Sequence, residues 1–192
     1  MKQKAKEYIN RGWSVIPVIG KVPIFVWKEY QGRIVNEDTI DLWWDANPKA
    51  NVGIVTGKIS GITVIDIDGE KGKESLRKLQ LPQTLISTTP NGFHLIFKYN
   101  TTYPQGVNIL PGVDIRNDGG FIVAPPSIGL QKDTKEEIEY YFVDESAVLD
   151  LGELPAFDKV FHENPIKPIE IRNPQWVEDL LKNGQTEPWR NH

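Results

Sequence analysis

The hydrophobic and polar positions of the chain follow two different periods. Apolar side chains spaced three and four residues apart predict helices, and short apolar runs between Gly, Pro and Asn residues predict strands. The expected helices cover residues 4–10, 38–46, 70–79 and 175–182. The expected strands cover residues 13–19, 51–56, 62–67, 84–88, 93–99, 113–116 and 121–124. Strands interspersed with helices indicate a domain of mixed α and β structure.

Short connections containing glycine indicate how the strands pair. Residues 57–61 predict a hairpin-like connection, and Pro90-Asn91-Gly92 predicts a turn between two strands. The Asp-Gly step within residues 117–120 suits a tight hairpin. Pro17 suggests that the first strand lies at an edge or carries a bulge. Strands joined in this way favour the α+β class with a largely antiparallel sheet.

The C-terminal part of the chain has a different character. Pro165, Pro168 and Pro174 punctuate it, which predicts a Pro-rich linker over residues 159–174 before the short helix. We expect the natural protein to continue beyond residue 192.

Composition narrows the class of protein. The chain has 192 residues, of which 39% are hydrophobic, so a sizeable core is expected in one large domain or in one domain plus an appendage. No apolar run approaches the roughly 20 residues of a membrane helix, and no secretory signal begins the chain. The absence of cysteine excludes disulfides and thiolate zinc sites in this segment. These features favour a cytoplasmic enzyme without a membrane partner.

Charge is distributed unevenly. The net charge of −4 argues against a surface that is basic throughout. Residues 1–33 nevertheless carry seven Lys and Arg against two Glu, whereas residues 133–163 carry ten acids against two Lys. A phosphate-binding surface is therefore expected in the N-terminal third. The alternative for Lys2, Lys4 and Lys6 is a solvated helix with scattered lysines.

The sequence Val64-Ile-Asp66-Ile-Asp68 is the strongest local signal for chemistry. Side chains two apart on a strand share a face, with Cα atoms roughly 6.6–6.8 Å apart. Two carboxylates placed so closely repel each other unless a cation lies between them, and their hard oxygens suit Mg²⁺ or Mn²⁺. The alternative is that both residues begin a turn and face water.

Two further strands carry polar residues opposite their apolar faces. His94 lies opposite the face formed by Phe93, Leu95 and Phe97, and a lone strand histidine is often structural or merely exposed. Asp114 and Arg116 share a face, where they could contact a metal and a triphosphate, or form an ordinary ion pair. If the strands form one sheet, all these polar side chains meet on one surface backed by a core.

In their order, these motifs resemble the bifunctional primase-polymerase (prim-pol) domain of the archaeo-eukaryotic primase superfamily. The resemblance covers residues 12–127. It is carried by five blocks, Gly12-Trp-Ser-Val-Ile-Pro17, Gly20-Lys-Val-Pro23 with Trp27, Asn51-Val-Gly-Ile-Val-Thr-Gly57, the acidic pair, and Val113-Asp-Ile-Arg116 with Gly119-Gly-Phe-Ile-Val-Ala-Pro-Pro-Ser127.

The resemblance implies an RRM-like catalytic sheet fused to a small N-terminal α/β unit. A catalytic domain is then expected over residues 1–158, with the N-terminal unit at about 1–50 and the catalytic core at about 51–158. Residues 159–192 would lead to a C-terminal helical region.

The resemblance also implies roles for individual residues. The metal-binding catalytic residues would be Asp66, Asp68 and Asp114. Nucleotide-binding residues would be His94, Arg116, Asn51, Thr56 and Gly57. Template contacts are expected, with the least support, from Lys21 and Trp27.

The expected activity is that of a DNA primase or DNA polymerase, which joins nucleoside triphosphates on a single-stranded DNA template. The cofactors would be two Mg²⁺ or Mn²⁺ ions. The partners would be template and primer, with a fused or associated helicase in the full-length protein. Two alternatives are a non-catalytic RRM-like module that binds nucleic acid and a metal-dependent nuclease.

Overall fold

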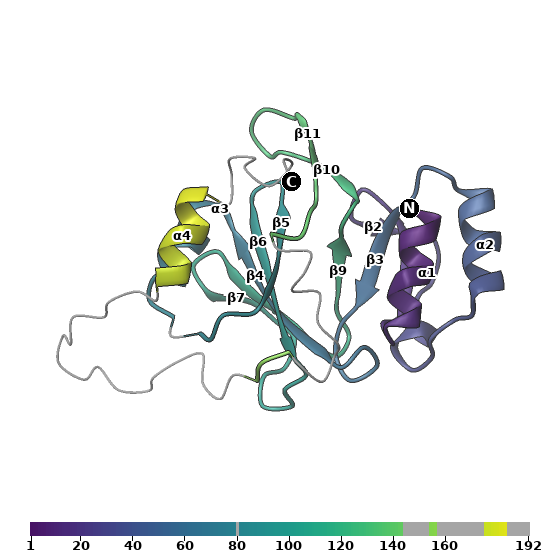
Figure 1. Cartoon of the computed structure of the whole chain (residues 1–192), viewed down its shortest axis with the longest axis horizontal. Coiled ribbons are helices and arrows are strands. Elements are labelled where there is room, and N and C mark those ends of the chain that lie inside the picture. The colour runs from purple at the N-terminus through teal and green to yellow at the C-terminus, as the bar shows by residue number, and fades with distance from the viewer. Residues whose placement is uncertain (80, 144–153, 157–174, 184–192) are drawn as a thin grey trace.

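The computed structural model describes residues 1–79, 81–143, 154–156 and 175–183. Within them the backbone forms two larger antiparallel sheets and a two-stranded ribbon, with helices on the outer sides (Figure 1). The α+β class and the antiparallel pairing predicted from the sequence are confirmed. The RRM-like, primase-type arrangement stays a prediction.

The first sheet combines strands from early and late parts of the expected catalytic domain. It has the order β2-β1-β3-β9. Its strands are β1 (Val15–Ile19), β2 (Val22–Pro23), β3 (Asn51–Val55) and β9 (Phe121–Ala124). Because β1 pairs with β3, the segment before residue 50 shares its sheet with later strands. The expected boundary near residue 50 stays a prediction.

Pro17 has a neighbouring strand on only one side, although β1 is not an edge strand of the sheet. Strand β1 lies between β2 and β3, but β2 pairs only with Val18 and Ile19. Pro17 therefore lies outside that short ladder, where its missing N–H costs no interstrand bond to β2.

The second sheet has the order β5-β6-β4-β8-β7. Its strands are β4 (Ile62–Asp68), β5 (Leu85–Thr89), β6 (Gly92–Lys98), β7 (Gly106–Leu110) and β8 (Val113–Arg116). The predicted hairpin of β5 and β6 around Pro90-Asn91-Gly92 is confirmed. Strand β7 was not expected from the sequence.

Two predicted hairpins are wrong. Strands β3 and β4 join different sheets, and the connection between them closes only with an isolated bridge of Gly57 and Ile62. Strands β8 and β9 also separate into different sheets after residues 117–120. Both short connections reverse the chain as predicted, but they lead it from one sheet to the other.

The helices lie outside the two sheets (Figure 1). Helices α1 (Lys2–Asn10) and α2 (Glu37–Ala46) lie beside the first sheet, and α3 (Gly69–Leu76) and α4 (Gln175–Asn183) beside the second. One core cluster extends from α1 and α2 through the first sheet to one face of the second. A second cluster lies between the other face of the second sheet and helices α3 and α4. The second sheet is thus covered on both faces.

Smaller elements complete the described residues. Strands β10 (Ile128–Leu130) and β11 (Glu137–Glu139) form the ribbon, and a short 3₁₀ helix covers Lys28–Gln31. No helix in the described part of the chain has the length and apolar character needed to cross a membrane. The predicted helix at residues 175–182 is confirmed as α4. The expected Pro-rich linker and the tail after residue 183 lie outside the described residues.

Candidate active site

The polar residues predicted from the sequence form one row across the second sheet. The strand register places His94 of β6 and Asp114 of β8 on either side of Asp66 of β4. Ser87 of β5 continues the row beyond His94. Four strands therefore bring together side chains that lie up to 48 residues apart, from Asp66 to Asp114.

The neighbouring rows on this face show where the site lies. On one side is a buried apolar row, which belongs to the core between the two sheets and contains Leu85, Ile96 and Val64. On the other side is the exposed Asp68 at the end of β4. The polar row thus lies where the space between the sheets opens to solvent.

One guanidinium lies between two of the carboxylates. Arg116 Nη2 is 2.6 Å from Asp114 Oδ2 and 3.1 Å from Asp66 Oδ2, and its Nε also donates to Asp66 Oδ2. These side chains are only 19–27% exposed, so the charges attract each other more strongly than a surface pair does. The arginine compensates for the repulsion expected between the two aspartates.

The carboxylate oxygens of this site fit a hard divalent cation, provided that the Arg116 side chain moves away. Carboxylate oxygens of Asp66 and Asp114 already converge on a positive charge, and Asp68 shares their face. In the described residues, no group of three or more Asp, Glu, His or Cys side chains lies close enough together to hold a metal ion. Arg116 therefore occupies the position that a cation between the carboxylates would take, and it would have to withdraw.

The His94 side chain is buried on the face of the second sheet that lines the space between the sheets. The imidazole is buried, its Nδ1 lies 3.4 Å from Ser87 Oγ, and its Nε2 lies 3.6 Å from Asp66 Oδ1. Burial lowers the pKa of His94, and the nearby Asp66 carboxylate acts against this shift. The imidazole ring also packs against the Tyr140 ring in a tilted arrangement, with ring centroids 6.2 Å apart. A neutral, oriented imidazole at pH 7 follows from this environment.

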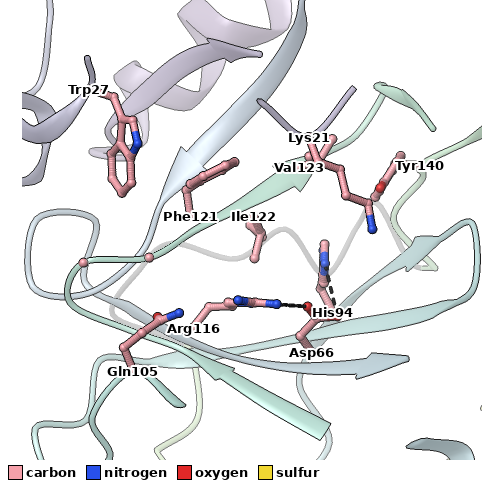
Figure 2. Close-up of a pocket in the computed structure, with 12 residues that line it drawn as sticks. Lys21, Trp27, Asp66, His94, Gln105, Arg116, Phe121, Ile122, Val123 and Tyr140 are labelled. Carbon is pink, nitrogen blue, oxygen red and sulfur yellow. Dashed lines mark hydrogen bonds and ion pairs between the residues drawn. The ribbon is translucent and has the colours of Figure 1, made fainter. Parts of the chain in front are cut away.

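A pocket of about 270 Å³ lies over this row, between the two sheets (Figure 2). Asp66, His94 and Arg116 line it from the second sheet, and residues 121–123 line it from β9. Asp68 and Asp114 do not line the pocket. The three aspartates are therefore neighbours in the fold, but only Asp66 faces this space.

Two pocket residues were missed by sequence reasoning. Tyr140 follows β11, and burial raises the pKa of its hydroxyl, with Asp66 and Asp68 adding to the shift. Gln105 immediately precedes β7. Neither belongs to an alternating pattern or a recognisable motif, so the sequence contains no signal that would have singled them out.

Three residues expected near the nucleotide do not line the pocket. Asn51 bridges backbone groups, because its amide donates to the Ile128 carbonyl and accepts from the Ile128 N–H. The Thr56 hydroxyl donates to the Asn117 carbonyl. Gly57 has φ +93°, and a Cβ there would lie 2.2 Å from Asp118 Oδ1. These contacts support the walls of the site, and a nucleotide-binding role for the three residues stays a prediction.

Lys21 and Trp27 reach the pocket from the N-terminal segment. Lys21 lies in the β1–β2 connection, and Trp27 packs edge-on against Phe121 with ring centroids 5.2 Å apart. Contact of either residue with template stays a prediction.

The lysines of α1 favour the alternative interpretation. Lys2 binds Asp45, Lys4 binds Glu7, and Lys6 binds Asp41, which neutralises much of the basic character of that helix. These three lysines therefore do not form an unpaired basic surface.

Similarity to known proteins identifies the family of this chain. No curated protein matches the chain. The family model described as "Bifunctional DNA primase/polymerase, N-terminal" matches residues 5–157, which include every residue of the polar row and of the pocket. The chain therefore belongs to the Prim-Pol family, whose description indicates nucleotidyl transfer of the primase/polymerase type.

Proposed function

We propose that this chain catalyses template-directed nucleotidyl transfer on single-stranded DNA. In this reaction the 3′-hydroxyl of a growing strand attacks the α-phosphorus of a nucleoside triphosphate. A new phosphodiester bond forms, pyrophosphate leaves, and the hydroxyl proton is lost to solvent. The observation that carries the proposal is the row of His94, Asp66 and Asp114, with Arg116 between the carboxylates, at the opening of a pocket.

Asp66, Asp68 and Asp114 would hold two Mg²⁺ or Mn²⁺ ions. When bound, such ions lower the pKa of the attacking hydroxyl and neutralise charge on the phosphates. The protein contributes by fixing the carboxylates on rigid strands, with Asp114 Oδ1 oriented by the backbone N–H of Asn108 at 2.7 Å.

Arg116 and His94 would position the triphosphate. The Arg116 guanidinium offers several donors in a planar fork that matches phosphate oxygens. It can leave the carboxylates for the phosphates without crossing the protein, because it already lines the pocket. His94 is uncharged at pH 7 and donates a hydrogen bond from an oriented ring, so its contribution is positioning rather than proton transfer. Lys21 adds positive charge from the other wall.

A primer-extension assay tests this function. We expect wild-type protein with primed single-stranded template, deoxynucleoside triphosphates and Mg²⁺ or Mn²⁺ to lengthen a labelled primer. Asp66→Ala should reduce the rate by at least about a hundredfold, since the loss of one charge-stabilising group costs about that much. Asp38→Ala is the matched control, because Asp38 is exposed in the first turn of α2, far along the chain from the polar row.

The same assay separates the alternatives. Primer shortened rather than lengthened would identify a metal-dependent nuclease. Template bound without any change in primer length would indicate a binding module. Extension by Asp66→Ala at the wild-type rate would reject the assignment of the site.

A further inference from the structure

The pocket has two chemically different ends (Figure 2). His94 and Tyr140 lie at one end, together with the Lys21 amine. Gln105 lies at the other end, on the side of Trp27. The Lys21 amine and the imidazole thus lie at the first end, and the Arg116 guanidinium lies between the two ends. The second end offers aromatic surface and one neutral amide.

The orientation of the Gln105 amide is fixed by its partner. The backbone N–H of Asn117 donates to Gln105 Oε1 at 2.9 Å. Because a backbone N–H can only donate, the oxygen must face Asn117 and the NH₂ group must point elsewhere. Figure 2 shows the amide nitrogen directed toward the side where Arg116 lies. Within the described residues, this NH₂ group has no hydrogen-bond acceptor.

The surroundings hold this amide in place. Asn117 is 2% exposed, and its own side-chain amide donates to the carbonyls of Asn100 and Tyr103, which anchors the loop before β7. Gly120 lies directly against Gln105, and a Cβ at that position would be 2.3 Å from Oε1. The amide therefore occupies space that only a glycine at position 120 leaves open.

The opposite wall at this end is apolar. Phe121 and Ile122 line it, and Trp27 packs against Phe121. An apolar wall facing a single oriented donor suits a nucleoside, whose faces are apolar and whose base and sugar carry acceptors. Phosphates are better matched by the charged end, which contains His94 and Lys21.

We propose that Gln105 binds the nucleoside part of the incoming nucleotide, donating a hydrogen bond from Nε2 to an acceptor on the base or sugar. The nucleotide then lies along the pocket with its triphosphate toward His94 and its nucleoside toward Trp27. This assignment rests on the proposed function and adds a positioning residue that no family motif in the sequence includes.

Isothermal titration of the full chain with dATP and, separately, with inorganic tripolyphosphate tests the proposal, both in the presence of Mg²⁺. Gln105→Met keeps the length of the side chain and removes the donor without adding a charge beside Arg116. It should weaken dATP binding roughly five- to tenfold and leave tripolyphosphate binding unchanged. His94→Gln should weaken both ligands, because both carry the triphosphate.

Two further variants make the test specific. Gly120→Ala adds no charge but displaces the Gln105 amide, so it should produce the same selective loss of dATP affinity. Gln131→Met is the matched control, because Gln131 Oε1 also accepts a hydrogen bond, from Thr134, and Gln131 does not line the pocket. It should leave both affinities at the wild-type value.

The outcomes distinguish the two proposals. If Gln105→Met and Gly120→Ala both bind dATP as tightly as the wild type, or lose dATP and tripolyphosphate equally, the role of Gln105 is wrong, whatever the primer-extension assay shows. If the wild type binds neither ligand and does not extend primer, the proposed function fails and the role of Gln105 fails with it.

Discussion

At the scale of single residues, one guanidinium neutralises two carboxylates that are direct neighbours across β4 and β8. Arg116 forms its shortest contact with Asp114 and two more with Asp66. Without a counter-ion, these carboxylates would repel each other at the opening of a core that is otherwise apolar. The arginine is thus a structural residue in the absence of metal and a candidate ligand for phosphate in its presence.

Replacement of Arg116 by Gln should therefore expose a metal-dependent difference in stability. In EDTA we expect the free energy of unfolding to fall by about 1–3 kcal/mol, because two partly buried carboxylates lose their charged partner. Added Mn²⁺ should raise the melting temperature of the variant more than that of the wild type, since a cation can then replace the guanidinium. Thermal melting with and without Mn²⁺ measures both effects.

Arg33→Gln provides the matched control for this experiment. Arg33 pairs with Glu29 at 2.9 Å, but both side chains are more than half exposed, so its loss should cost less than about 1 kcal/mol. Equal responses of Arg116→Gln and Arg33→Gln to Mn²⁺ would contradict the idea that Arg116 takes the place of a cation.

The buried imidazole of His94 should make stability depend on pH. Burial lowers the pKa of His94 in the folded protein below the ordinary value of 6.5, so the unfolded chain binds the proton first as pH falls. The free energy of unfolding should therefore decrease below about pH 6.5, by at most about 1.4 kcal/mol per pH unit, until the folded pKa is reached. His94→Gln should lack this contribution.

Urea unfolding at several pH values between 5 and 8 measures the effect of His94. The difference in stability between wild type and His94→Gln should be largest above pH 6.5 and should narrow toward pH 5. A difference that stays constant over this range would show that the folded and unfolded pKa values of His94 are the same.

At the scale of elements, two glycine-containing connections carry the chain between the sheets and so build the site. Residues 57–61 lead from β3 to β4, and residues 117–120 lead from β8 to β9. The two connections touch each other, since Asp118 accepts a hydrogen bond from the Lys58 N–H and Gly57 lies against Asp118. This contact fixes one end of the space between the sheets.

Gly57→Ala should break that contact. A side chain at φ +93° is strained, and the new Cβ would lie 2.7 Å from the Asp118 backbone as well as 2.2 Å from its carboxylate. We expect a loss of about 3 kcal/mol or more in the free energy of unfolding, measured by urea denaturation. Gly20→Ala is the control, because φ is +57° there but nothing lies within 4 Å of the new Cβ. A loss of only about 1 kcal/mol is expected for it.

The sequence predicts which residues form strands better than it predicts which strands pair with each other. Alternation along β4, β6 and β8 correctly separated the faces of Asp66, His94 and Asp114, because side chains two apart on a strand must share a face. The turn signals at residues 57–61 and 117–120 correctly marked reversals of the chain. They could not show that each reversal changes sheet, because a turn specifies local backbone angles and not which distant strand supplies the next hydrogen bonds.

The pocket residues show a second limit of sequence reasoning. Gln105 and Tyr140 lie outside the alternating strands, so no periodic pattern marks them. Their places depend on long-range contacts, such as the hydrogen bond from the Asn117 N–H to Gln105 and the stacking of Tyr140 near His94. Residues brought to a site by such contacts become visible only when the fold is known.

At the scale of the whole molecule, the N-terminal segment and the later strands form one core. Strand β1 pairs with β3 over four residues, and β3 pairs in turn with β9. The Tyr8 hydroxyl of α1 donates to the Pro125 carbonyl, a buried hydrogen bond between segments 117 residues apart. Tyr8, Trp13 and Ile54 belong to the same apolar cluster. The pocket is lined from both parts of the chain.

Deletion of residues 1–50 should therefore abolish cooperative folding of the remainder. The deletion would leave β3 without its partner β1 and would expose the apolar face that α1 and α2 cover, so aggregation through a free strand edge is expected. Circular dichroism during urea titration, with the full chain as reference, should show no sharp transition for residues 51–192. A cooperative transition in that fragment would instead mean that the catalytic core folds independently. Lys21 and Trp27 would then line the pocket from a separate unit, and nucleotide binding by the fragment alone would show how much of the site that unit supplies.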